Sequence, residues 1–171
     1  KKLGNVGALV ELPSIYSYQT ARENLVYQYI NLGLKIDETI DQSLQFVGLG
    51  NTGKKKAGKF SLGMRQRLGI AMAMSGNPEV LILDEPTAAL DPISENELYL
   101  KYNELTEDKI SFFISHRLSS TRFCDRILFI KDGAIAESGT HEELMALKGA
   151  YYRMYQTQSM YYKEMGVAVN E

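Results

Sequence analysis

The sequence predicts an α/β protein with a parallel sheet at its core, an α-helical subdomain ahead of most of that sheet, and a C-terminal β-hairpin with helices. The main observation is a pair of runs, VLIL (80–83) and ISFFIS (110–115), that are apolar on both faces, as parallel strands covered by helices are. A helical pattern separates the two runs, which is the spacing of a βαβ unit. The residues before Pro78 carry mostly helical periodicity instead. A chain of 171 residues, 44% hydrophobic and 23% charged, is long enough for one such domain.

Ahead of Pro78 we expect one strand and three helices. The short apolar run VGALVEL is expected to form the strand, which ends before Pro13. Thr20 and Glu23 have the spacing of a capping box, in which each side chain satisfies the other residue's backbone N–H, so a helix begins there. The expected helices cover about 20–31, about 37–47, and the residues from Ser61 to the Gly76-Asn77-Pro78 stop.

After Pro78 the pattern changes to alternating strands and helices. Ser94 and Glu97 form a second capping box, which opens a helix between the two apolar strands. The segment RILFIKDGAIAESG reads as two strands around an Asp132-Gly133 turn. A third capping box, Thr140 to Glu143, begins a helix that leads into a tail rich in Tyr and Met.

Composition excludes several classes of protein. The apolar runs are far shorter than the roughly 20 residues that a membrane helix needs, and the single cysteine, Cys124, excludes an internal disulfide. With only His116 and His141 as histidines, no zinc spacing is present. The net charge of −2 implies no broad basic face for nucleic acid. A reducing cytoplasm fits these features best.

Residues 48–56, GLGNTGKKK, match the phosphate-binding pattern G-x-x-x-x-G-K up to its last letter. A genuine phosphate loop ends in Ser or Thr, follows a buried strand and opens a helix, whereas Lys55 stands at the hydroxyl position here. The preceding residues have the helical spacing Ile36, Ile40, Leu44 and Val47. We interpret the segment as a helix end followed by a solvated basic turn.

The first apolar strand ends in Asp84-Glu85-Pro86, and ligands of open α/β sheets bind beyond the carboxyl ends of the strands. Two adjacent acids there suit phosphoryl transfer, in which one carboxylate holds Mg²⁺ and the next orients or deprotonates the attacking water. An alternative is that Asp84 and Glu85 only cap a following turn. The neighbouring strand ends in His116, which can hydrogen-bond a γ-phosphate, while His141 lies in a capping box and is a structural residue.

The start of the third helix and the connection at Asp91 are further candidate parts of the site, although each also has an ordinary structural explanation. Ser61 begins a helix whose free N–H groups can bind an anion, and Gly63 permits a close backbone approach, although an ordinary N-cap explains Ser61 equally well. Asp91 lies in a tight connection before a helix and is either a site residue or an N-cap.

The chain resembles the ATP-binding subunit of ABC transporters, and the resemblance covers essentially its whole length. It rests on the order and spacing of three segments, FSLGMRQR (60–67), LILDEPTAALD (81–91) and SHR (115–117). The resemblance implies the P-loop ATPase fold, ATP and Mg²⁺ as cofactors, and ATP hydrolysis. Its LSGGQ signature corresponds to residues 60–64, where Ser61 and Gly63 are retained but Leu62 and Met64 depart from the pattern.

The same resemblance implies roles for the other candidates. Asp84 is the carboxylate on the Mg²⁺ side and Glu85 the catalytic base, Asp91 falls on the D-loop and His116 on the switch histidine. The glutamine of the family's Q-loop aligns with Glu11, and an acid there resembles the bacitracin and lantibiotic resistance branch.

The family's phosphate loop, Walker A, and its adenine contact precede the Q-loop, so we expect this chain to be an N-terminally truncated domain that begins after both. GLGNTGKKK then lies in the helical subdomain as a coincidental match. The expected parts are a helical signature subdomain over about 12–78, a βα catalytic core over about 79–150, and a C-terminal helix over 151–171. Residues up to about 80 resemble a stand-alone resistance ATPase, and the later ones resemble the ATPase end of a peptide exporter.

The expected function is therefore that of an ATP-hydrolysing subunit that powers export of a peptide or an antibiotic-like substrate. The expected partners are separate transmembrane permease subunits and a second ATPase subunit in a head-to-tail dimer, on the cytoplasmic side of the plasma membrane. One alternative is a nucleotide-free regulatory or interaction module derived from such an ATPase. Another, a related protein that acts on nucleic acid or the ribosome, is disfavoured by the charge.

Overall fold

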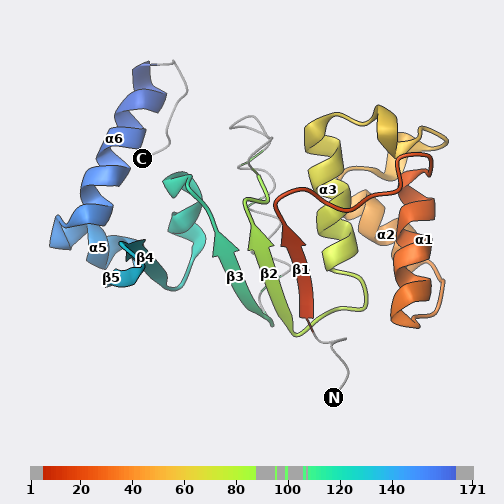
Figure 1. Cartoon of the computed structure of the whole chain (residues 1–171), viewed down its shortest axis with the longest axis horizontal. Helices are drawn as coiled ribbons and strands as arrows, with labels where there is room; N and C mark the ends of the chain where they lie inside the picture. The colour runs from red at the N-terminus through yellow and green to blue at the C-terminus, as the bar shows by residue number, and fades with distance from the viewer. Residues whose placement is uncertain (1–5, 88–94, 96–98, 100–105, 107, 165–171) are drawn as a thin grey trace. The chain divides into compact units, whose positions relative to one another are not determined.

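A computed structural model describes residues 6–87, 95, 99, 106 and 108–164 (Figure 1). The chain divides into two compact units, Lys1–Ile114 and Ser115–Glu171. The subdivision expected from the sequence, with boundaries near residues 78 and 150, stays a prediction. No helix within the described ranges is long and apolar enough to cross a membrane.

The first unit contains a three-stranded parallel sheet in the order β1-β2-β3 (Figure 1). The strands are β1 (Val6–Val10), β2 (Val80–Asp84) and β3 (Ile110–Ile114). Their last residues, Val10, Asp84 and Ile114, are aligned across the sheet. The predicted parallel sheet is confirmed, and its β-branched and aromatic residues are those that favour strands.

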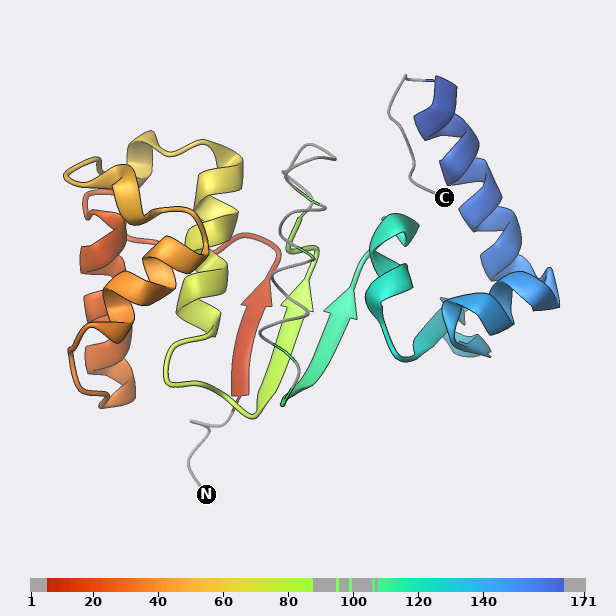
Figure 2. The ribbon, with the colours of Figure 1, turned by 180° about the vertical axis from the view of Figure 1, so that it is seen from behind.

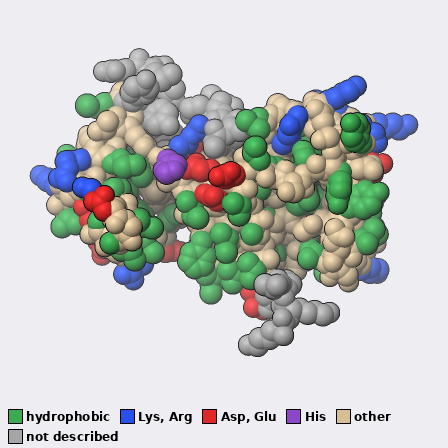
Figure 3. Space-filling view, in the orientation of Figure 1, with side chains coloured by type: hydrophobic (Ala, Val, Ile, Leu, Met, Phe, Trp, Pro, Cys, Tyr) green, Lys and Arg blue, Asp and Glu red, His purple; other side chains and the backbone are tan. Residues whose placement is uncertain are grey.

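The two faces of this sheet differ in burial. Leu9, Leu81 and Leu83 point to a buried face, and on it the ring of Tyr99 packs edge-on against Phe113 with the centroids 6.5 Å apart. On the opposite face, Ile110, Phe112 and Ile114 of β3 and Val10 of β1 are each more than half exposed, and hydrophobic side chains gather there in Figure 3. The expectation that helices cover both faces of the sheet is therefore not met by the described residues.

Three helices lie beside β1: α1 (Ala21–Leu32), α2 (Thr39–Phe46) and α3 (Leu62–Ala73) (Figure 1). Both bonds of the predicted capping box are present, from the Glu23 N–H to Thr20 Oγ1 (3.1 Å) and from the Thr20 N–H to Glu23 Oε2 (2.6 Å). Gly33 ends α1 in the left-handed conformation, with φ 68°. The 3₁₀ turns η2 (Gly50–Thr52) and η3 (Ala57–Lys59) connect α2 to α3.

The second unit consists of a β-hairpin and the helical segments that pack on it. Its elements are η4 (Leu118–Phe123), β4 (Ile127–Lys131), β5 (Ala134–Gly139), α5 (His141–Leu147) and α6 (Ala150–Glu164). The hairpin turns at Asp132 and Gly133 as predicted, and both residues have positive φ (53° and 76°), which a tight two-residue turn requires. The capping box of Thr140 and Glu143 is also confirmed.

A small core holds this unit together. Leu118, Ile127, Leu144 and Tyr151 are buried against one another, and Cys124 packs on them. Burial raises the pKa of the Cys124 thiol, as expected of a packed core residue and not of a nucleophile. Burial also lowers the pKa of His141, whose Nδ1 lies 2.8 Å from the Tyr151 hydroxyl oxygen, so this histidine is structural as predicted.

Candidate functional site

The candidate site begins where the central strand β2 ends. Asp84 is its last residue and is half-buried. Glu85 has a φ of 45°, which lies outside strand geometry, while its N–H still donates to the Ile114 carbonyl at 2.9 Å. A positive φ is costly for a residue with a side chain and often marks a functional position. The structure thus places both predicted carboxylates at the carboxyl end of the sheet.

The residues after Glu85 are anchored by contacts that the sequence did not reveal. Thr87 is fully buried, and its hydroxyl donates to Glu95 Oε1 at 3.0 Å and lies 2.9 Å from the Tyr99 hydroxyl oxygen. Glu95 and Tyr99 are helical and are themselves buried. Because the Thr87 hydroxyl contacts both Glu95 and Tyr99, these buried side chains restrain the turn that follows Glu85.

Glu11 lies just beyond the end of the neighbouring strand β1. It is exposed and also has a positive φ, 51°. The Nε2 of Gln66, on helix α3, donates to the Glu11 carbonyl at 3.0 Å, although the two residues are 55 positions apart. Gln66 is only 2% exposed, and its Oε1 has no hydrogen-bond partner among the described residues. The position of the Glu11 backbone is therefore tied to α3.

Helix α3 carries two further candidates, Ser61 and Gly63, at its N-terminus. The Ser61 Oγ accepts from the Met64 N–H at 3.2 Å, which makes Ser61 the N-cap, and Gly63 lies in the first turn. Figures 1 and 2 show that α3 runs opposite to the strands, so its N-terminus lies on the side of their carboxyl ends. The Ser61 hydroxyl is used in the cap, as the alternative from the sequence stated, and the remaining N–H groups of the first turn are those that an anion would use.

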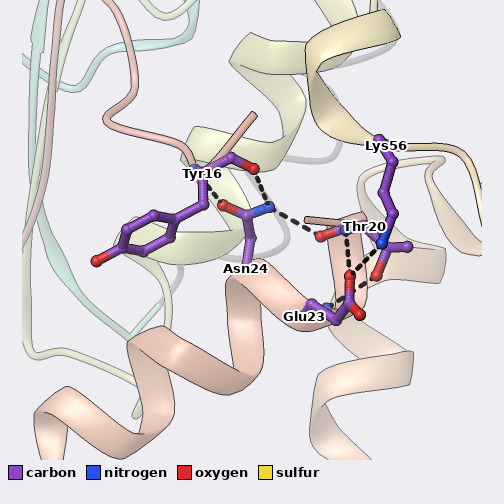
Figure 4. Close-up of polar contacts among 5 residues, drawn as sticks. All are labelled: Tyr16, Thr20, Glu23, Asn24 and Lys56. Atoms are coloured by element: carbon purple, nitrogen blue, oxygen red, sulfur yellow. Dashed lines mark hydrogen bonds and ion pairs between the residues drawn. The ribbon is translucent and has the colours of Figure 1, made fainter. Parts of the chain in front are cut away.

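A polar network joins the segment after Glu11 to the loop before Ser61 (Figure 4). The buried Asn24 side chain holds Tyr16 on both sides, accepting from its N–H (2.7 Å) and donating to its carbonyl (3.2 Å). Lys56 Nζ lies 3.1 Å from Glu23 Oε2. The Thr20 N–H and then Lys56 lower the pKa of Glu23. The segment around Tyr16, the start of α1 and the turn at Lys56 are thus joined by one set of contacts.

The segment GLGNTGKKK lies between α2 and α3 and not between a strand and a helix. Its first residues follow α2 and form η2, and Lys54 is an exposed turn residue. The segment therefore lacks the strand-to-helix context of a phosphate loop, as predicted, and Lys54, Lys55 and Lys56 are all exposed, as expected of a solvated basic turn. Lys56 pairs with Glu23, and Lys55 Nζ lies 5.7 Å from the centroid of the Phe60 ring.

The last two candidates are His116 and Asp91. His116 is exposed and follows β3 in the second unit, and its role stays a prediction. The predicted D-loop residue Asp91 and most of the helix expected after Ser94 lie outside the described residues. In the described part of the chain, no three His, Cys, Asp or Glu side chains form a group that could hold a metal ion.

A parallel sheet with paired carboxylates at its carboxyl end, beside a helix whose N-terminus lies on the same side, is typical of α/β nucleotide-binding domains. The family model described as ABC transporter matches residues 2–88, which are 87 of the 171 residues. The chain therefore belongs to the ABC transporter family, and it carries sequence of the ATP-binding domain.

Individual relatives agree with this assignment. The bacitracin transport ATP-binding protein BcrA of Bacillus licheniformis is 43% identical over 138 residues, which are 79% of this chain and 45% of that protein. The multidrug resistance protein sirA of Leptosphaeria maculans is 39% identical over 163 residues, which are 90% of this chain and 13% of that protein. The chain thus spans less than half the length of these relatives. A bacitracin transport ATP-binding protein, the first kind of relative that the resemblance named, is thus found together with a multidrug resistance protein.

A solved structure supports the fold alone. The bacterial Atm1-family ABC exporter with ATP bound has a TM-score of 0.79 to this chain at 24% identity, over 91% of this chain and 29% of that chain.

Proposed function

We propose that these residues belong to an ATP-hydrolysing subunit or domain that powers export of a peptide or an antibiotic-like substrate. The observation that carries the proposal is the Asp84-Glu85 pair at the end of the central parallel strand, with the backbone of Glu85 turned out of strand geometry. The match to the family and the likeness to BcrA support it.

Asp84 is proposed to hold Mg²⁺. A hard carboxylate oxygen fits this ion, and Mg²⁺ is usually bound by one or two carboxylates together with water and nucleotide phosphates. This fits the half-buried Asp84 carboxylate at the end of β2. The ion would supply positive charge to the phosphate oxygens.

Glu85 is proposed to orient the attacking water and accept its proton. The contacts of Thr87 with Glu95 and Tyr99 support this role, because they hold the adjoining turn and keep the carboxylate in a defined place. His116 is proposed to hydrogen-bond the γ-phosphate. Glu11 and Asp91 are proposed to line the same nucleotide site.

Ser61 and Gly63 are proposed to act on a second subunit. In the proposed head-to-tail dimer, the N-terminus of α3 closes on ATP held mainly by the partner, and its dipole favours the phosphate charge. The dimer is proposed to work with transmembrane permease subunits at the cytoplasmic face of the plasma membrane.

A hybrid protein tests the function. We would replace the region of BcrA that this chain matches by residues 1–171, and compare this hybrid with the 171-residue chain alone. The hybrid is expected to bind and hydrolyse Mg-ATP. Residues 1–171 contain no complete G-x-x-x-x-G-K-S/T motif. By themselves they are expected to bind Mg-ATP a thousandfold or more weakly, since about three missing charge-assisted phosphate bonds of roughly 1.5–3 kcal/mol each cost on the order of 5 kcal/mol.

Calorimetry with Mg-ATP and a phosphate-release assay measure both quantities. Micromolar affinity of residues 1–171 by themselves would contradict the expectation that they contain no working phosphate loop. A folded hybrid that neither binds nor hydrolyses ATP would favour the alternative, a nucleotide-free regulatory or interaction module derived from the ATPase.

The same hybrid tests the position of the phosphate loop. Lys54→Ala is expected to leave nucleotide affinity unchanged and to shift the free energy of unfolding by less than about 0.5 kcal/mol, because Lys54 is an exposed turn residue. Lys56→Ala is the control, since it removes the pair with Glu23 from the same turn. Loss of nucleotide binding in Lys54→Ala, with an unchanged circular dichroism spectrum, would mean that GLGNTGK is a working phosphate loop.

A further inference from the structure

Helix α6 reaches the backbone of the candidate histidine through one side chain, that of Gln158. Its Nε2 donates to the His116 carbonyl at 2.7 Å, and its Oε1 accepts from the Leu118 N–H at 3.0 Å. A primary amide carries one acceptor and one donor group, so a single side chain satisfies both backbone groups. The opposite orientation of the amide would set donor against donor and acceptor against acceptor.

Helix α6, which carries Gln158, is bonded to both η4 and β5 near its N-terminal end. Tyr151, seven residues earlier and two turns away on the same side of α6, is fully buried. Its hydroxyl oxygen lies 2.7 Å from Thr121 Oγ1 in η4. The Glu137 carboxylate of β5 accepts from the Ala150 and Tyr151 N–H groups at the start of the helix. Helix α6 therefore holds η4 at two points, through Tyr151 and Gln158.

A local hydrogen bond also restrains the segment between β3 and η4. The Arg117 N–H donates to Ser115 Oγ at 3.0 Å, which folds the chain around His116. Gln158 bonds the groups on either side of Arg117, the carbonyl before it and the N–H after it. The place of the exposed His116 thus depends on a residue 42 positions later in the chain.

We infer that Gln158 is a positioning residue that holds His116 where it can hydrogen-bond the γ-phosphate, so that α6 controls ATP turnover. The inference rests on the proposed function of His116. A donor must lie within a few tenths of an ångström of its place to stabilise the reacting phosphate, and a displacement of about 1 Å costs up to 10²-fold in rate. A change in the contacts between α6 and η4 would then shift His116 and lower the rate of ATP hydrolysis, although α6 itself does not contact the nucleotide.

The test uses the substitution Gln158→Leu, which keeps the size of the side chain and removes both hydrogen bonds. Gln156→Leu is the matched control, because it makes the same change at an exposed position of the same helix. In Gln158→Leu, exchange of the Leu118 amide hydrogen, followed by NMR in the 171-residue chain, is expected to accelerate about fivefold or more. In the hybrid protein, kcat is expected to fall roughly tenfold with little change in the KM for ATP. Gln156→Leu should change neither.

Gln158→Glu and a double variant separate positioning from general destabilisation. Gln158→Glu keeps an acceptor for Leu118 and loses the donor to His116, so it should protect the Leu118 amide and still lower kcat. In a His116→Ala background, Gln158→Leu should cause no further loss of kcat, since both act through one group. A further loss of the same size would show a merely structural role and would overturn the inference.

Failure of the inference and failure of the proposed function give different results. If Gln158→Leu leaves Leu118 exchange and kcat unchanged while His116→Ala lowers kcat, the inference is wrong and the role of His116 stands. If His116→Ala hydrolyses ATP at the parent rate, the proposed role of His116 is wrong, and the inference falls with it.

Discussion

Glu85→Gln is expected to lower ATP turnover of the hybrid protein about a hundredfold or more, while ATP and Mg²⁺ still bind. Glutamine keeps the shape of the side chain and a hydrogen bond to water, but it does not accept a proton. The backbone at position 85 does not change, because its N–H still donates to the Ile114 carbonyl and Thr87 still anchors the turn. The ATP-bound dimer should therefore accumulate.

Asp84→Asn is the matched control for this prediction, because it makes the same change from acid to amide one residue earlier. It removes the charge proposed to help hold the metal, so Mg-ATP binding itself should weaken and the dimer should not form. Size-exclusion chromatography with ATP, together with a phosphate-release assay, separates the two variants. Turnover of Glu85→Gln at the parent rate would show that another residue is the base and that the two roles are assigned wrongly.

Gly7→Ala is expected to destabilise the first unit by roughly 3 kcal/mol or more. Gly7 is a buried residue of β1, and a Cβ atom there would lie 1.9 Å from the Ala73 carbonyl oxygen and 2.9 Å from Pro78 Cγ. The first of these contacts is with backbone, so β1 and the C-terminal end of α3 have to move apart.

Thermal unfolding followed by circular dichroism measures this effect, and a drop in Tm of about 6–12 °C is expected for a chain of this size. Val10→Ala on the same strand is the control, since the Val10 side chain is 62% exposed and its truncation should cost about 0.5 kcal/mol or less. A Gly7→Ala protein with the parent Tm would show that the contact between β1 and α3 is looser than described.

The order and type of the described elements follow from short stretches of sequence. The capping boxes that begin at Thr20 and Thr140 predicted the starts of α1 and α5, because both partners of such a box lie within one turn. The runs VLIL and ISFFIS predicted parallel strands, and the Asp132-Gly133 pair predicted the hairpin turn. The position of Asp84 and Glu85 at a strand end follows from the same local patterns.

Tertiary structure alone decided how the candidate residues are held. Gln66 reaches Glu11 across 55 positions, and Gln158 reaches Leu118 across 40. The helical spacing of Tyr151, Tyr155 and Gln158 indicates a docking helix, but neither glutamine's partner can be read from a local pattern. Hydrophobic periodicity shows which face of an element is buried, but it carries no information about which backbone group a buried amide meets. The sequence therefore determined which residues carry the proposed chemistry. Only the packing of α3 against β1 and of α6 against η4 determined which residues position them, since those contacts exist only after distant segments have come together.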